Sequence, residues 1–100
     1  MSKRVYLASG NLLFRAALGA AVTAAGAEVA TDATSCDLAV VEIEPPGAVD
    51  RIRGFVAAGV RVLAYGPHVR PDLLREAREA GATAVPNSEV ERQLRTLLAS

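Results

Sequence analysis

The stretch Asp-Leu-Ala-Val-Val-Glu-Ile-Glu-Pro-Pro-Gly, residues 37–47, decides the fold of this chain. Its apolar run is continuous and does not alternate with polar residues, which is typical of a strand buried on both faces of a parallel sheet. Two prolines and Gly47 end the strand in a loop, and Glu42 and Glu44 stand at its carboxyl end. We therefore interpret the stretch as the central strand of a parallel sheet.

Outward from this strand, short apolar runs alternate with amphipathic segments. The pattern predicts strands at residues 4–8, 28–31, 38–42, 61–65 and 83–85, and helices at 12–25, 48–58, 71–80 and from 88 onward. A helix terminus favours the left-handed conformation of glycine, so Gly26, Gly59 and Gly81 indicate three helix ends. Helix starts are indicated by Ser9 or Asn11 as an N-cap, by Pro71 at a first helical position, and by a Ser88–Glu91 capping box.

Only residues 32–37 connect the second and third predicted strands, and six residues rich in Asp, Thr and Ser form a loop. Strands that alternate with helices specify an α/β fold. We expect a three-layer, doubly wound, parallel five-stranded sheet in the order 2-1-3-4-5, without the helix between strands 2 and 3. The helix at 12–25 is apolar on two sides, so more than one neighbour is expected to cover it.

Length and composition set further bounds. One hundred residues, 51% of them hydrophobic, predict a single domain over residues 1–100. The formal net charge is zero, which provides no overall attraction for nucleic acid or an anionic membrane. The apolar run 12–25 is too short to span a bilayer, and the single Cys36 can form neither an internal disulfide nor a metal site. We expect a cytoplasmic protein without a cofactor, a metal, a nucleic-acid partner or membrane contact.

In a doubly wound sheet, ligands bind outside the carboxyl ends of the strands where the winding reverses. That rule places one group of side chains together at the edge near strands 1 and 3. The candidate site consists of Ser9, Gly10, Asn11, Glu42, Glu44, Gly66, His68 and Asn87.

Residues 37–47 resemble the third strand and following loop of response-regulator receiver domains, where the strand ends in a phosphorylated Asp and a Pro-Gly pair follows. Gly-Ala-Thr-Ala-Val at residues 81–85 is similar to the entry of that family's fifth strand. The resemblance implies a flavodoxin-like fold. In the family, Mg²⁺ held by two acids after strand 1, a Ser or Thr ending strand 4, and a Lys ending strand 5 assist phosphate transfer.

The resemblance also implies that this chemistry is lost. Glu42 stands at the phosphoacceptor position and residues 8–10, Ala-Ser-Gly, stand where the metal-binding acids belong. Tyr65 or Gly66 falls at the Ser/Thr position, and Asn87 lies near the Lys position. Without metal ligands or a cation, little stabilises a transferring phosphoryl group. The chain is thus interpreted as a degenerate receiver, a pseudo-receiver.

Two hypotheses follow. The first is a non-catalytic regulatory module that is not phosphorylated and binds a protein partner or itself as a homodimer, because the absent helix leaves an apolar face uncovered. The second is a small-molecule or anion-binding protein, or an enzyme, that uses the crevice at the carboxyl ends of strands 1 and 3. Glu42 is open to two interpretations, a mimic of a phosphorylated Asp or a solvated surface acid.

Overall fold

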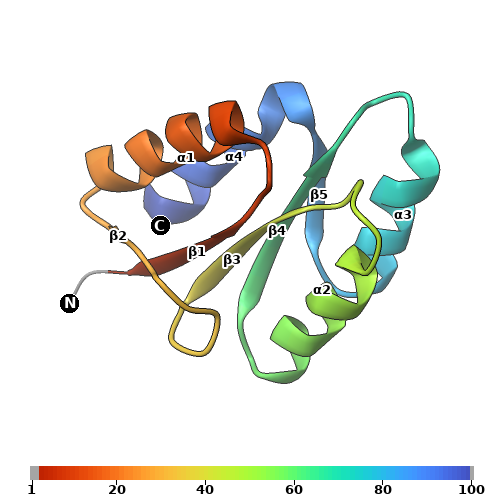
Figure 1. Cartoon of the computed structure of the whole chain (residues 1–100), viewed down its shortest axis with the longest axis horizontal. Coiled ribbons are helices and arrows are strands. Elements are labelled where there is room, and N and C mark those ends of the chain that lie inside the picture. The colour runs from red at the N-terminus through yellow and green to blue at the C-terminus, as the bar shows by residue number, and fades with distance from the viewer. Residues whose placement is uncertain (1–2, 100) are drawn as a thin grey trace.

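The computed structural model describes residues 3–99, and Figure 1 shows helices packed on both faces of a twisted sheet. The elements in chain order are β1 (Arg4–Ala8), α1 (Leu12–Ala24), β2 (Glu28–Val29), β3 (Leu38–Glu42), α2 (Ala48–Ala57), β4 (Arg61–Gly66), α3 (Pro71–Glu79), β5 (Thr83–Pro86), a 3₁₀ turn (Asn87–Glu89) and α4 (Val90–Ala99). The observed bounds differ from the predicted ones by at most two residues.

All strand pairs in the sheet are parallel, and the order is β2-β1-β3-β4-β5. This confirms the predicted fold class. The central strand β3 pairs with β1 on one side and with β4 on the other, and its register places Glu42 opposite Tyr65. The second strand is shorter than expected, because β2 lies at the edge of the sheet and pairs only with β1.

The two faces of the sheet carry separate cores. α1 and α4 cover one face, and α2 and α3 cover the other (Figure 1). The first core includes Leu18, Leu63, Tyr65 and Leu94. The second core consists largely of smaller side chains around Ile52, and Tyr6 and Phe55 lie half-buried at its margin.

The helix between strands 2 and 3 is absent, as predicted: residues 30–37 form a loop. From β2 the chain passes β1 to reach β3, in the same direction as the later crossovers from β3 to β4 and from β4 to β5. Because such crossovers are right-handed, all three lie on the same face of the sheet. The missing helix would therefore lie beside α2, and its absence uncovers that face near β1.

Local signals at the helix ends largely agree with the sequence. Gly26, Gly59 and Gly81 have φ values of 79°, 80° and 105°, in the left-handed region that glycine favours. Pro71 is the first residue of α3, and the Asn11 side chain caps α1. The prediction of a Ser88–Glu91 capping box was wrong, because the 3₁₀ turn at Asn87–Glu89 leads directly into α4.

The expectation that more than one neighbour covers α1 was correct, because α1 packs against α4, β1 and β2. Leu18, Ala21 and Val22 are buried, but Leu12 and Leu13 are 78% and 83% exposed. Helical periodicity alone could not show which apolar residues of α1 its neighbours cover. Among the described residues, no helix has the length and apolar character needed to cross a membrane.

Candidate functional site

The carboxyl edge of the sheet brings together a polar cluster of Ser9, Glu42 and Tyr65. Ser9 follows β1, Glu42 ends β3, and Tyr65 stands opposite Glu42 in β4. The Ser9 hydroxyl donates to Glu42 Oε1 at 3.4 Å, and the Gly10 amide donates to the same oxygen at 3.1 Å. Ser9 and Tyr65 share a further hydrogen bond between their hydroxyl groups. The carboxylate thus fixes the turn after β1 to the end of β3.

Tyr65 is almost fully buried, and its ring lies 5.1 Å from the ring of Phe14 between centroids. Burial raises the pKa of the Tyr65 phenol, the Ser9 hydrogen bond lowers it, and the negative charge of Glu42 raises it. The phenol therefore stays neutral near pH 7 and acts as a hydrogen-bonding group rather than as a base. The sequence analysis left Tyr65 or Gly66 open at the end of this strand and included only Gly66 in the candidate site.

Asn11 and Gly66 lie near the cluster, but their roles are in the local structure. The Asn11 side-chain oxygen accepts hydrogen bonds from the amides of Leu13 and Phe14, at 3.0 and 3.2 Å, and so caps α1. Gly66 is buried at the end of β4, where an added Cβ would lie 2.5 Å from Cγ1 of Ile43. Glycine is favoured there because an added Cβ would force the Ile43 side chain to shift.

The remaining predicted site residues lie apart from this cluster. Glu44 is exposed and lines a cavity of about 240 Å³ beside α2, and His68 is exposed in the loop before α3. Asn87 begins the 3₁₀ turn after β5. None of the three forms a hydrogen bond with Ser9, Glu42 or Tyr65. Among residues 3–99, no group of three or more His, Cys, Asp or Glu side chains is arranged to hold a metal ion.

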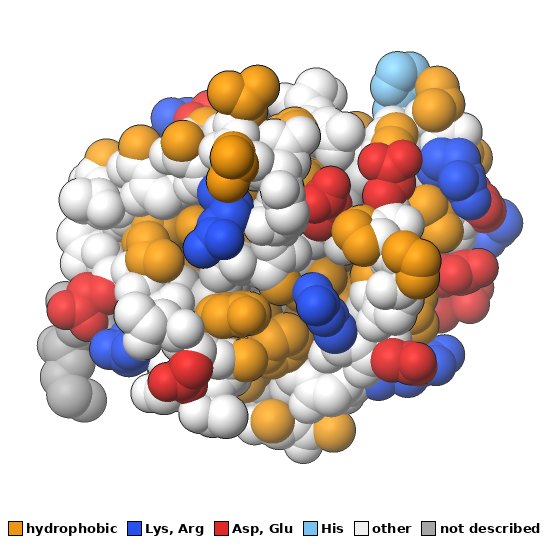
Figure 2. All heavy atoms as spheres, in the orientation of Figure 1, with side chains coloured by type: hydrophobic (Ala, Val, Ile, Leu, Met, Phe, Trp, Pro, Cys, Tyr) orange, Lys and Arg blue, Asp and Glu red, His pale blue; other side chains and the backbone are white. Residues whose placement is uncertain are grey.

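A larger cavity lies where the crossover helix is missing. It measures about 610 Å³, and the groove is formed by Tyr6 of β1, Thr34 and Cys36 of the β2–β3 loop, and Arg51 and Phe55 of α2, among others. Figure 2 shows hydrophobic side chains at the surface between that loop and α2, with a basic side chain beside them. The missing helix indicated an uncovered face, but the sequence did not identify these side chains as its lining.

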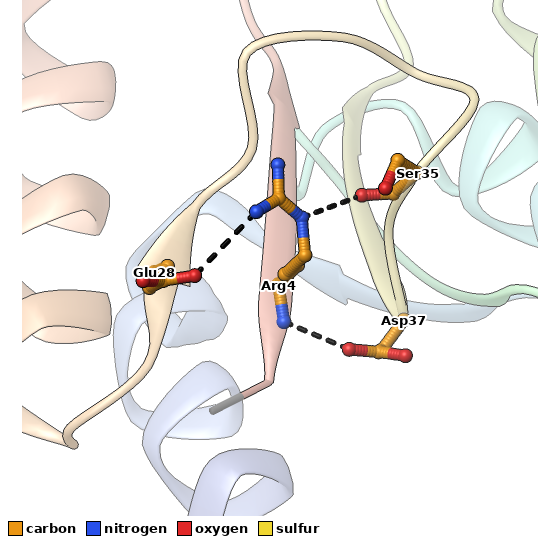
Figure 3. Close-up of polar contacts among 4 residues, drawn as sticks. All are labelled: Arg4, Glu28, Ser35 and Asp37. Carbon is orange, nitrogen blue, oxygen red and sulfur yellow. Dashed lines mark hydrogen bonds and ion pairs between the residues drawn. The ribbon is translucent and has the colours of Figure 1, made fainter. Parts of the chain in front are cut away.

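The loop beside the groove is held by Arg4 (Figure 3). The Arg4 guanidinium donates to the Ser35 carbonyl at 2.9 Å and lies 3.5 Å from the Glu28 carboxylate. The Arg4 amide donates to Asp37 Oδ2 at 2.8 Å, and the Asp37 amide donates back to the Arg4 carbonyl at 2.8 Å. These contacts hold the β2–β3 loop in place, as packing would hold a helix, so this wall of the groove has a defined position.

Cys36 lines the groove and is half-buried. Burial raises the pKa of its thiol, and the charges of Asp37 and Asp32 raise it further. A thiol with a raised pKa is mostly protonated near neutral pH and is a weak nucleophile. Cys36 is therefore part of the lining of the groove and is not an activated nucleophile.

Comparison with known proteins defines the fold more closely. No family model matches the chain, and no curated protein sequence matches it. Among solved structures, the BeF3-activated receiver domain of DrrB is similar over 99% of this chain and 96% of its own, with a TM-score of 0.82 and 12% identity.

Two further structures agree. A response regulator from Thermotoga maritima is similar over 100% of both chains, with a TM-score of 0.78 and 17% identity. A CheY-like response regulator receiver domain protein from Methanospirillum hungatei JF-1 is similar over 99% of this chain and 92% of its own, with a TM-score of 0.80 and 14% identity. The chain has the fold of response-regulator receiver domains.

Proposed function

We propose that this protein is a non-catalytic, receiver-like regulatory module in the cytoplasm, which is not phosphorylated and works by binding protein. The observation that carries this proposal is the hydrogen bonding of Glu42. Its carboxylate accepts from the Gly10 amide and the Ser9 hydroxyl, and Ser9 in turn bonds Tyr65. The carboxyl edge of the sheet is thus closed by contacts within the chain.

The chemistry of the edge supports the same conclusion. Phosphate transfer to a carboxylate requires groups that neutralise charge on the phosphoryl oxygens, such as a divalent cation or a lysine. Mg²⁺ takes oxygen ligands in an octahedron and is usually held by carboxylates. The turn after β1 supplies Ala8, Ser9 and Gly10, and the neighbouring Tyr65 side chain is buried and neutral.

Glu42 has a structural role in this proposal. A carboxylate held by a backbone amide and a hydroxyl links the turn after β1 to β3, so the edge keeps one arrangement. This supports the interpretation of Glu42 as a fixed charge over that of a purely solvated acid. We propose that the domain is regulated by the presence of its partner and not by modification of this residue.

Protein binding is assigned to the face that lacks its crossover helix. Tyr6 and Phe55 lie at its margin with centroids 6.1 Å apart, and the groove between α2 and the loop leaves apolar surface open. Uncovered apolar surface of this kind marks an interaction site. The partner is another protein or a second copy of this chain.

Exposure to phosphoryl donors tests the proposal. The chain is titrated with Mg²⁺ and beryllofluoride, or incubated with acetyl phosphate, while its amide spectrum and intact mass are followed. We expect no saturable change in the spectrum and no added phosphate. A saturable change that is present in the natural protein and in Asp50→Asn, but lost in Glu42→Gln, would contradict the proposal.

Binding of an anion or small molecule at the carboxyl edge stays a prediction. The oxygens of Asn11 and Glu42 that face this edge are already hydrogen bonded within the chain. A thermal-shift panel of phosphates and nucleotides tests it. Stabilisation that weakens in Asn11→Ala beyond the loss caused by the missing helix cap would support a ligand there.

A further inference from the structure

The groove has a basic residue on one wall and an acidic residue next to the other wall. Arg51 lines the groove from α2, and in the described residues 3–99 it has neither a hydrogen-bond acceptor nor an acidic partner for its guanidinium. In contrast, Arg53 on the same helix pairs with Asp50 at 3.5 Å. Asp32 is exposed in the opposite loop, next to the lining residues Ala33 and Thr34. The groove therefore has a basic wall, an apolar floor and an acidic rim.

The acidic rim is ordered before any partner binds. Asp32 Oδ1 accepts from the Thr34 amide at 2.9 Å and from the Thr34 hydroxyl at 2.6 Å. Farther along the loop, Arg4 holds the Ser35 carbonyl and the Asp37 side chain (Figure 3). The two hydrogen bonds from Thr34 thus both end on Oδ1 of Asp32. A preordered loop loses little conformational entropy on binding, which favours association.

We propose that a second copy of this chain covers the groove, related to the first by a two-fold axis. A two-fold interface uses the same patch on both subunits, so the patch must be complementary to itself. An acidic rim and a basic wall on either side of an apolar floor meet that condition. The axis places Arg51 of each copy against Asp32 of the other and the two apolar floors in contact. This assignment rests on the proposed function, because it names the partner of the same groove.

Charge and size are compatible with this pairing. The formal net charge of zero leaves no overall repulsion between two copies. A standard interface buries about 800 Å² on each partner, a small part of the 5659 Å² surface of this chain. The molecule measures 35 × 27 Å across its two longer axes, so the side seen in Figure 2 is wide enough for such an interface.

Charge reversal with rescue tests the pairing directly. Sedimentation equilibrium of the full chain over a wide concentration range is expected to show a monomer–dimer equilibrium. Arg51→Glu and Asp32→Lys should each weaken dimerisation by roughly tenfold, because each reversal affects two symmetric ion pairs. The double variant Arg51→Glu with Asp32→Lys should recover most of the lost affinity. Arg75→Glu, the same charge change on α3, is the matched control and should leave the dimer unchanged.

A second measurement uses the only cysteine of the chain. Cys36 lines the groove, so a second copy should bury it. Its alkylation by iodoacetamide at pH 8.5 should slow several-fold as the protein concentration rises through the dimerisation range. In Arg51→Glu the slowing should shift to higher concentration. A rate that is independent of protein concentration would overturn the pairing, even if the charge variants prove poorly folded.

The outcomes separate this inference from the proposed function. A chain that remains monomeric at every concentration, or a double variant that fails to recover while its circular dichroism is unchanged, would overturn the two-fold pairing. Neither result bears on the response to beryllofluoride, which tests the closed carboxyl edge. A protein that dimerises as described but responds to beryllofluoride would keep this inference and overturn the proposed absence of phosphorylation.

Discussion

The carboxyl edge of the sheet and the groove beside α2 differ in whether their polar side chains are paired. At the edge, Ser9, Glu42 and Tyr65 bond one another and are buried or half-buried. At the groove, Arg51 lines a largely apolar cavity, and its guanidinium pairs with no acid among residues 3–99. Satisfied buried polar groups stabilise one arrangement, whereas an unpaired charge beside apolar surface favours a partner. The chain thus has the fold of a receiver domain, and its open surface lies away from the carboxyl edge of the sheet.

The largest expected contrast comes from deleting one aromatic ring in each region. Tyr65→Ala should lower the free energy of unfolding by about 3–5 kcal/mol, because it leaves a cavity in a closed core. Phe55→Ala should cost only about 1–2 kcal/mol, because this ring is half-buried at the margin of an open groove. Urea unfolding followed by circular dichroism measures both values. Equal losses would show that the groove is packed as tightly as the edge.

The next effect concerns space at the end of β4. Gly66→Ala should destabilise the fold by about 1–3 kcal/mol, because the new Cβ meets the buried Ile43 side chain. Gly19→Ala in α1 is the control: its Cβ would lie 3.9 Å from Leu7, and alanine favours a helix by about 1 kcal/mol. Thermal unfolding should move the two variants in opposite directions. A neutral Gly66→Ala would mean that the edge relaxes more easily than its contacts imply.

A smaller effect isolates one hydrogen bond of the edge. Tyr65→Phe keeps the ring against Phe14 and removes the hydroxyl that bonds Ser9. We expect a loss of about 1 kcal/mol, because the buried Ser9 hydroxyl loses a partner but keeps Glu42. Chemical unfolding measures this loss. No change in stability would indicate that the hydroxyl contact contributes nothing to the closed edge.

The smallest effect concerns the acidic rim of the groove. The Thr34 side chain, followed by the Thr34 amide, lowers the pKa of Asp32 below its usual value. A lowered pKa adds stability that is fully present above the ordinary Asp range and is lost as the pH falls through the folded pKa. Titration by nuclear magnetic resonance should find a low pKa that rises towards the usual value in Thr34→Ala. An unchanged pKa in that variant would remove Thr34 as the cause.

Local signals explain why most of the fold could be predicted from the sequence. Gly26, Gly59 and Gly81 require a conformation that other residues avoid, so they identify helix ends without knowledge of distant contacts. The six residues between the second and third strands are too few for a crossover helix. The exposed side of α1 could not be predicted, because Leu12 and Leu13 are apolar whether or not another helix covers them.

The site was harder to predict because its contacts join distant parts of the chain. Ser9 and Tyr65 are 56 residues apart, and only the register of β3 and β4 sets Tyr65 beside Glu42. Asn11 was expected at the site, but a helix start uses its side chain locally. The groove could be predicted in part. The sequence indicated that the helix between β2 and β3 is absent, but only the folded structure shows that Tyr6 and Phe55 contact each other.

One series of amide spectra tests the contrast between edge and groove most directly. The protein is diluted stepwise, and Mg²⁺ with beryllofluoride is then added to the dilute sample. We predict that amides of the groove, including Thr34, Gly54 and Ala58, shift on dilution, and that amides of the edge, including Gly10, Glu42 and Gly66, do not respond to beryllofluoride. The account would be contradicted if the edge amides shift with beryllofluoride and the groove amides do not shift on dilution.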